Sequence, residues 1–167
     1  MGFGQASIML KVGFILIIVA LVIQILAVAL PYWYSKEVAN NYDVYGGLFR
    51  GCAEAGNTKA CNNVKNPTDW WAATQAFEII GLLILVAALI LCIIVLFVKD
   101  MKILKMVNFI LCFCSCGFII IGVIIYGAES EGWLAEYSGA FALAIIAGIV
   151  ALVAGVLCLL DWMKAPA

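Results

Sequence analysis

The sequence has 167 residues, of which 67% are hydrophobic and only 11% are charged. A soluble domain is about 45–50% apolar and about 25% charged, so this composition indicates an integral membrane protein. The absence of histidine excludes Ser-His-Asp and Cys-His catalysis, HExxH zinc sites and His-ligated haem. The formal net charge is −1 and Arg50 is the sole arginine, which argues against nucleic-acid binding.

Four windows are long and apolar enough to cross a membrane, which takes about 20 residues for about 30 Å of hydrocarbon. They are residues 12–30, 79–98, 106–126 and 138–160. All four must be helical, because an open sheet edge finds no hydrogen-bond partner in lipid. We therefore expect an all-α transmembrane fold in which residues 1–167 form a single four-span domain. Its outer loops are residues 31–78 and 127–137.

The lysines next to the spans orient the protein in the membrane. If the spans alternate in direction, five of them fall on one side: Lys11, Lys99, Lys102, Lys105 and Lys164. The positive-inside rule makes that side, with both termini, cytoplasmic. Ala27-Val28-Ala29 also resembles a signal-peptidase site, whose use would remove the first span. Against cleavage, the apolar run is longer than the usual h-region of about 7–15 residues.

The long outer loop has the composition of a small antiparallel sheet. Its β-branched and aromatic residues favour strands, and Asn40-Asn41 and Gly46-Gly47 interrupt them. Cys52 and Cys61 lie in this loop, on the side where thiols oxidise, and the turn pair Gly56-Asn57 separates them. This pattern predicts a hairpin clamped by a disulfide, which supplies order that so short a loop cannot obtain from a core.

The remaining cysteines lie in the cytoplasmic halves of the spans, where we expect reduced thiols that serve as small packing residues. They are Cys92, Cys112, Cys114, Cys116 and Cys158. Cys112 and Cys116 share a helix face, but without histidine or a second cysteine pair packing is favoured over metal binding. Cys158 lies near the inner boundary of the membrane and is a candidate for palmitoylation.

The span interiors favour packing over transport. Small residues repeat at spacing four in the last span, for example Ala140, Ala144 and Gly148, which allows close helix approach within the bundle. Gln24 is expected to hydrogen-bond across the bundle. Glu78 lies at the outer entrance of the second span, where we expect water to reach it. Trp70 and Trp71, which precede it, are expected to anchor this end of the span at the membrane interface. No acid or base lies inside the four windows, which argues against pumping.

Residues of the long loop resemble a known signature. Trp33, then Gly47-Leu48-Phe49, then Cys52 and Cys61 follow the W…GLW…C…C order of the claudin and peripheral myelin protein superfamily. Phe49 stands where tryptophan is usual. The resemblance covers the whole chain and implies a four-helix bundle topped by a disulfide-stapled extracellular β-sheet, which Trp33, Gly47, Leu48 and Phe49 hold in place.

Within this superfamily the sequence is more similar to the epithelial membrane protein branch than to typical claudins. Ala73-Thr74-Gln75-Ala76 enters the second span, where claudins typically have Arg near Gln75. Tyr137-Ser138-Gly139-Ala140-Phe141, which follows Trp133, also resembles that branch. The residues after Leu160 lack the hydrophobic end of a PDZ-binding tail, so we expect no scaffold contact of that kind.

The resemblance implies a structural protein of the plasma membrane that acts in cell–cell adhesion, junctions or membrane apposition. Its outer loops would meet further copies in cis or in trans, with Trp133 and Tyr137 as contact residues. Alternatively, these two aromatics sit at the lipid headgroups. A second hypothesis is an auxiliary subunit of a larger channel or receptor. We expect that the protein is not an enzyme and that it has no cofactor, metal site or nucleic-acid partner. Membrane lipid is expected to surround its spans.

The charges of the outer loop do not support an ion-selective pore. Residues 31–75 carry four basic and four acidic side chains, so no field of one sign is expected. Asn62, directly after the second cysteine, is neutral. An enzyme such as a thiol–quinone oxidoreductase would need an outward-facing CxxC pair, and Cys114-Ser115-Cys116 has a different spacing.

Overall fold

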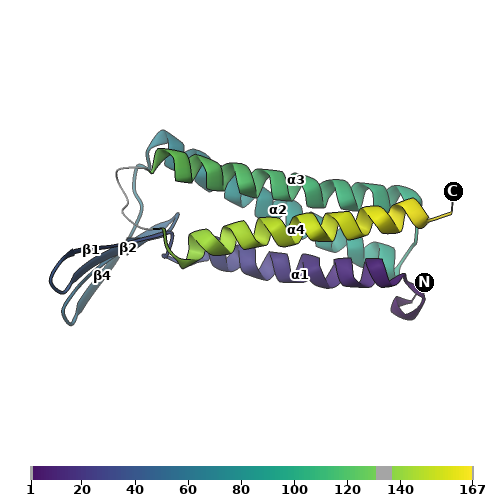
Figure 1. Ribbon diagram of the computed structural model, residues 1–167, viewed down its shortest axis with the longest axis horizontal. Coiled ribbons are helices and arrows are strands. Elements are labelled where there is room, and N and C mark those ends of the chain that lie inside the picture. Colours follow the sequence, from purple (N-terminus) through teal and green to yellow (C-terminus); the bar gives the residue numbers. More distant parts are fainter. Residues whose placement is uncertain (1, 131–136, 167) are drawn as a thin grey trace.

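The fold was obtained as a computed structural model that describes residues 2–130 and 137–166. Its regular elements are the short 3₁₀ helix Phe3–Gln5, the helices α1 (Ile8–Ala29), α2 (Asp69–Phe97), α3 (Lys102–Glu129) and α4 (Gly139–Lys164), and the strands β1 (Tyr34–Ala39), β2 (Tyr42–Gly46), β3 (Arg50–Ala55) and β4 (Thr58–Asn63). The four helices lie side by side, and the sheet projects beyond one end of the bundle (Figure 1). Both chain ends lie at the opposite end.

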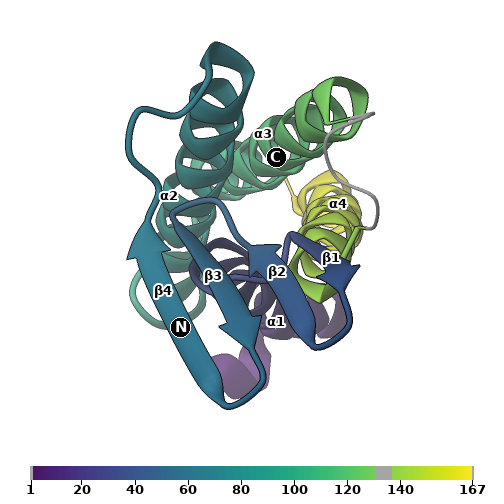
Figure 2. The same ribbon diagram turned by 90° about the vertical axis from the view of Figure 1, so that its left-hand side faces the viewer.

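Each of the four helices is long and apolar enough to cross a membrane. Viewed from the sheet, α1 packs on α4, α4 on α3, and α3 on α2 (Figure 2). The predicted four-helix bundle with an antiparallel sheet is therefore confirmed. Because the number of candidate spans is even, both ends of the chain lie on the same side of the bundle, opposite the sheet.

The helices extend past the apolar windows expected from hydropathy. α2 begins at Asp69, ten residues before the expected start at residue 79, and α4 continues to Lys164. Hydropathy locates the part of a helix that lipid surrounds, whereas the helix itself continues for as long as its backbone and packing allow. Trp70, Trp71 and Glu78 consequently lie on α2 instead of in a loop.

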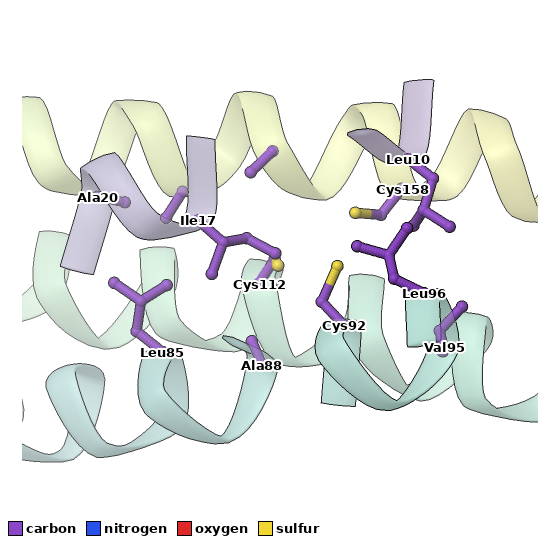
Figure 3. Close-up of a cluster of buried hydrophobic side chains, with 12 residues drawn as sticks. Leu10, Ile17, Ala20, Leu85, Ala88, Cys92, Val95, Leu96, Cys112 and Cys158 are labelled. Carbon is purple, nitrogen blue, oxygen red and sulfur yellow. The ribbon is translucent and has the colours of Figure 1, made fainter. Parts of the chain in front are cut away.

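Small residues and thiols fill the centre of the bundle. Its main cluster brings together Ile17, Leu85, Cys92, Cys112 and Cys158, all at most 2% exposed (Figure 3). The repeats of small residues on α4 face inward, as expected for intramolecular packing. Their members are Ala140, Ala144, Ala147, Gly148, Ala151 and Gly155, all of them buried. A Cβ added at Gly148 would lie 2.8 Å from Ile120 of α3, so the two helices approach closely there.

The expectation that all five free cysteines are packing residues needs one correction. Cys92, Cys112 and Cys158 are buried and Cys116 is half-buried, but Cys114 is exposed. Cys114 lies between Cys112 and Cys116 on α3, so the 100° turn per residue carries its side chain away from their inward face. The Cys158 thiol accepts a hydrogen bond from Asn108 Nδ2 at 3.6 Å. Its burial disfavours acylation of the folded protein, because the acylating enzyme must reach the sulfur.

The expected exposure of Glu78 to water is wrong. Glu78 and Gln24 are both 0% exposed, and Gln24 Nε2 donates to Glu78 Oε2 over 2.7 Å. On the other side, a Cβ at Gly122 of α3 would lie 2.5 Å from Glu78 Oε1. Gln24 bonds across the bundle as predicted, and its partner is a carboxyl group that the hydropathy window had placed outside the core.

The sheet is a four-stranded antiparallel meander in the order β1-β2-β3-β4. Asn40-Asn41 joins β1 to β2, and Gly56-Asn57 joins β3 to β4 in a two-residue turn, as Ala55 pairs with Thr58. Asn41 and Gly56 have φ values of 64° and 59°, the left-handed conformation that Asn and Gly tolerate best in hairpin turns. The turn pairs therefore locate the β1–β2 and β3–β4 hairpins, and an irregularity between Glu37 and Ala39 then shifts the β1–β2 register by one residue.

The close contact of α2 with α3 gives a test of the packing. A Cβ at Gly81 would lie 2.6 Å from Ile119 Cγ1 and 3.4 Å from the Ser115 carbonyl oxygen. Gly81→Leu is expected to lower the free energy of unfolding in detergent micelles by about 1–3 kcal/mol, because overpacking forces the helices apart. Gly117→Leu is the matched control, since a Cβ there meets no atom within 4 Å. Equal unfolding midpoints for the two variants would contradict the packing described.

Candidate functional site: the outer sheet and its anchor

Trp33 fastens the sheet to the helices. Its side chain is 0% exposed, and its indole Nε1 donates to the carbonyl oxygen of Ala27 at 2.7 Å. The ring meets Tyr126 of α3 edge-on at 4.9 Å and Phe141 of α4 at 5.7 Å between centroids. A single residue just before β1 therefore contacts three helices, through geometries that aromatic pairs prefer.

The segment between β2 and β3 makes the second attachment. Leu48 is 0% exposed, and its carbonyl oxygen accepts hydrogen bonds from Trp71 Nε1 at 2.9 Å and Gln75 Nε2 at 2.6 Å. Gly47 lies so close to the end of α1 that a Cβ there would be 2.9 Å from Pro31 Cα. Gly47 is thus required because the two backbone segments approach too closely for a side chain. The Leu48 side chain is buried at the end of the bundle that faces the sheet.

Aromatic rings fill the space between the two attachments. Trp70 and Trp71 lie 5.4 Å apart, and each is within 5.9 Å of Tyr126 between centroids. Both tryptophans are half-buried. The predicted interfacial anchors therefore lie at the beginning of α2, in the interface between sheet and bundle, where Trp71 also binds the Leu48 carbonyl oxygen.

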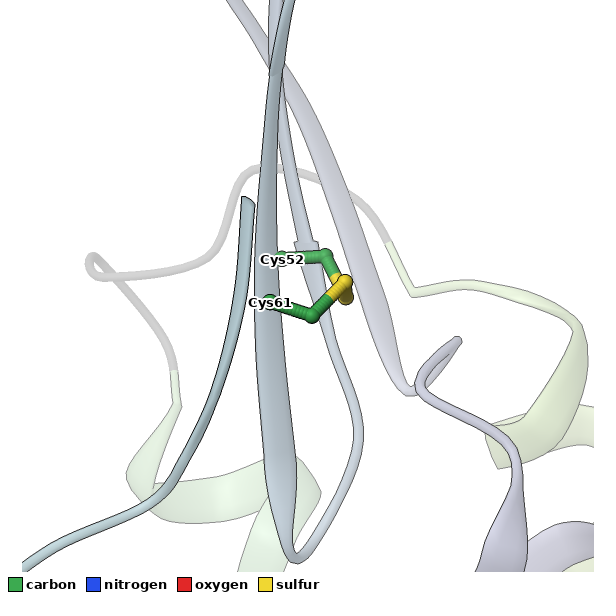
Figure 4. Close-up of a disulfide and its surroundings, with 2 residues drawn as sticks. All are labelled: Cys52 and Cys61. Carbon is green, nitrogen blue, oxygen red and sulfur yellow. A yellow bond between two sulfur atoms is a disulfide. The ribbon is translucent and has the colours of Figure 1, made fainter. Parts of the chain in front are cut away.

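The Cys52–Cys61 disulfide joins β3 to β4 (Figure 4). The two cysteines are directly opposite each other in the sheet, with 4.1 Å between their Cα atoms. The Val64 N–H donates to the Phe49 carbonyl oxygen at 2.9 Å. Because hydrogen-bonded and non-bonded pairs alternate in an antiparallel ladder, Cys52 and Cys61 form a non-bonded pair. The N–H groups of odd-numbered β4 residues then point away from β3.

The two edges of the sheet differ. At the β1 edge, Tyr34 bridges to Tyr137, and the Ser138 N–H donates to the Trp33 carbonyl oxygen at 3.0 Å. β4 pairs with β3 alone in the described part of the chain, which leaves its outer edge free. A free edge presents unpaired backbone donors and acceptors to another strand.

The predicted contact residues have different positions. Tyr137 is 48% exposed, with its ring stacked on Phe141 at 4.5 Å and its hydroxyl donating to the Gly127 carbonyl oxygen at 3.0 Å. Trp133 lies outside the described residues. Among the signature residues Phe49 is 40% exposed, whereas Trp33 and Leu48 are fully buried. Phe49 and Tyr137 thus combine attachment to the fold with an accessible aromatic ring.

A row of charged side chains crosses the sheet. The equal numbers of basic and acidic residues in the loop gave no sign of this row. Glu37 pairs with Asp43, Asp43 with Glu54, and Glu54 with Lys59, so three carboxylates on adjacent strands are followed by one ammonium. A hydrogen bond to the Tyr45 side chain raises the pKa of Lys59, whose ammonium also lies 5.3 Å from the Tyr45 ring centroid. The Gly56-Asn57 turn accounts for the pairing of Glu54 with Lys59. The pairing of Glu37 with Asp43 depends on a register shift between Glu37 and Ala39, which the Asn40-Asn41 turn does not predict.

No group of three or more His, Cys, Asp or Glu residues able to hold a metal occurs within residues 2–130 and 137–166. Cys112 and Cys116 belong to helix packing in this arrangement. The sheet and its surroundings thus combine a disulfide, a β4 edge with no partner strand in the described part of the chain, and accessible aromatic rings.

Comparison with known families agrees with this architecture. The family model described as PMP-22/EMP/MP20/Claudin family matches residues 6–158. The chain belongs to this family. A comparison with curated proteins finds no match. Family membership, four apolar helices, a four-stranded sheet and the Cys52–Cys61 disulfide together make the protein a claudin-like, multi-pass membrane protein.

The close approach at Gly47 predicts a specific sensitivity. In this claudin-like fold, Gly47→Ala should push the Leu48 segment away from α1, because the new Cβ would meet backbone atoms that cannot give way. We expect misplacement of the outer sheet, measured as loss of surface delivery and faster proteolysis of the outer loop. Gly51→Ala is the control, since its Cβ would have an ordinary contact of 3.8 Å with the Tyr34 hydroxyl. A normally delivered, protease-resistant Gly47→Ala protein would refute this role.

The disulfide predicts a second sensitivity of the sheet. Cys52→Ser combined with Cys61→Ser removes a cross-link that spans nine positions and is worth about 3 kcal/mol for a loop of this size. The outer sheet should unfold and the protein should be retained inside the cell, as measured by surface biotinylation. Cys114→Ser, at an exposed free thiol, controls for the substitution. Normal trafficking and assembly of the double variant would show that the bridge is dispensable.

Proposed function

We propose that this protein is a structural membrane protein that acts in cell–cell adhesion, junction formation or membrane apposition through self-association of its outer loops. We place it at the plasma membrane, as its resemblance to the family implies, with both termini in the cytoplasm, an orientation that the positions of its lysines support. Within its family we place it nearer to the epithelial membrane proteins than to typical claudins, on the residues around Gln75 and Tyr137. It has no catalytic role.

The observation that carries this proposal is the free β4 edge on a rigid platform. The sheet is fixed to the bundle through Trp33 and Leu48 and is cross-linked by the disulfide. It therefore loses little conformational entropy when a partner binds. A preorganised surface binds more tightly for the same contact area because less conformational freedom is lost. A second copy can add its own strand through main-chain hydrogen bonds.

The charge row would set the register of such contacts. Glu37, Asp43 and Glu54 are all exposed, and like charges brought face to face oppose association. Two copies therefore approach best where the lysine of one meets the carboxylates of the other. This polarity favours a defined arrangement of copies over stacking of identical faces.

The edge is tested by blocking one backbone donor. Asn63 lies in the outward-pointing set of β4, so Asn63→Pro removes an N–H group without breaking the ladder to β3. We expect the variant to fold and to reach the cell surface but to reduce aggregation of expressing cells at least several-fold. Asn63→Ala keeps the N–H group and is the matched control. Undiminished aggregation with Asn63→Pro would rule out association through this edge.

A second candidate function is that of an auxiliary subunit bound to a larger membrane protein. The observation that favours it lies on α3, where Cys114 is exposed and a Cβ at Gly117 would meet nothing within 4 Å. Small residues on an outer helix face allow another helix to approach closely. Purification in mild detergent separates the two functions: oligomers of this chain support adhesion, and a stoichiometric foreign subunit supports the auxiliary role.

A further inference from the structure

A cavity of about 220 Å³ lies at the end of the bundle opposite the sheet. It is formed where α1 begins, where α2 and α4 end, and where α3 begins. The residues that determine its chemistry are Ser7, Leu10, Asp100, Lys105, Asp161 and Lys164. Ser7 and Lys164 are exposed, so the cavity opens to the outside at this end of the protein.

A buried ion-pair network forms one side of the cavity. Lys105 Nζ is 3.1 Å from Asp100 Oδ1 and 3.1 Å from Asp161 Oδ2. Ser7 Oγ donates to Asp161 Oδ1 and accepts from the Leu10 N–H, so it caps α1. Two carboxylates therefore share one ammonium, which leaves this side with one excess negative charge. The Asp100 side chain remains 28% exposed and accessible, whereas that of Asp161 is 5% exposed.

The side chains around the cavity set its polarity. The N-termini of α1 and α3 and the C-termini of α2 and α4 all lie at this end of the bundle, so their opposite partial charges largely cancel. The acidic part of the cavity is therefore formed by Asp100 and Asp161. Lys164 adds a free positive charge at the mouth. The cavity as a whole is nearly neutral but has separate acidic and basic parts. Such a site matches a zwitterion that carries a hydrogen-bonding cation and an anion a few atoms apart.

The position of the cavity indicates where such a ligand comes from. The apolar part of α4 ends at Leu160, directly before Asp161. Large apolar side chains next to the mouth face outward, with Ile8 72% exposed and Met163 64% exposed. A volume of about 220 Å³ is below the about 300–1,000 Å³ of pockets that enclose a whole drug-sized molecule. It suits a headgroup whose chains lie outside along the helices.

We propose that this cavity binds the phosphoethanolamine headgroup of a membrane phospholipid, with its ammonium at the accessible Asp100 and its phosphate at Lys164. The ammonium supplies the second cation that the paired carboxylates lack. A primary ammonium has three N–H donors, whereas the trimethylated ammonium of choline has none. The site therefore selects ethanolamine over choline lipids through hydrogen bonds as well as charge.

The test uses the purified full-length protein in neutral detergent micelles. Bound lipid is counted by native mass spectrometry during titration with phosphatidylethanolamine, phosphatidylcholine or phosphatidylglycerol of the same acyl chains. We expect phosphatidylethanolamine to bind about ten-fold more tightly than phosphatidylcholine, as the loss of charge-assisted hydrogen bonds implies. Equal binding of the two, or a preference for phosphatidylglycerol, would overturn the proposal, the latter result indicating an ordinary basic surface.

Variants locate the site. Asp100→Asn should abolish the preference for phosphatidylethanolamine and leave the Lys105–Asp161 pair in place, whereas Asp69→Asn at the opposite end of the bundle should keep it. Lys164→Gln, at an exposed position, should weaken binding of both phospholipids about equally, and it serves if Asp100→Asn does not fold. Retained selectivity in Asp100→Asn, or unchanged affinity in Lys164→Gln, would refute the assignment.

The source of the headgroup is tested separately. Soluble phosphoethanolamine carries the same charges without acyl chains, so it should bind far more weakly than the lipid. Tight binding of the soluble molecule would overturn the assignment to a membrane lipid. This inference depends on the four spans alone and is independent of adhesion by the outer sheet.

Discussion

The buried indole of Trp33 is the constraint on which the outer half of this protein depends. A sheet of about thirty residues cannot enclose a core of its own, so it uses the ends of α1, α3 and α4 as one. The indole N–H is satisfied by Ala27 at 2.7 Å, which makes full burial of the ring favourable. With Trp33 in place, β1 starts at a fixed point, and Leu48 reaches the groups on α2 that bind its carbonyl oxygen.

Polar side chains fix the helices in a similar way at both ends of the bundle. Gln24 and Glu78 join α1 to α2 near the sheet, and Lys105 and Asp161 join α3 to α4 at the other end. Apolar packing in lipid has no hydrophobic driving force between helices. Hydrogen bonds and close contacts at small residues must then choose among the rotations that apolar faces alone would allow.

Much of this architecture could be predicted from local sequence patterns, and the failures have a common cause. The spans, the sheet, both hairpin turns and the Cys52–Cys61 pair each depend on residues near one another in the chain. The burial of Glu78, the exposure of Cys114 and the inward position of Trp71 depend on where other helices lie. A hydropathy window ends at a charged residue, so hydropathy places the Glu78 side chain in water. In the fold Glu78 is buried and accepts a hydrogen bond from Gln24, which lies 54 positions away in the sequence. The acidic row at Asp43 was hidden because a charge count ignores register.

The attachments of the sheet to the bundle are made to main-chain oxygens. The carbonyl groups of Ala27, Tyr32, Trp33 and Leu48 accept the bonds. Such acceptors persist whatever side chain the residue carries, so the four strands can exchange their outward side chains without loosening the joint. The fold thereby separates two parts of the chain that can evolve differently. The residues that attach the sheet to the bundle tolerate little change, whereas the outward side chains of the strands can change one at a time and so alter which partners the sheet prefers.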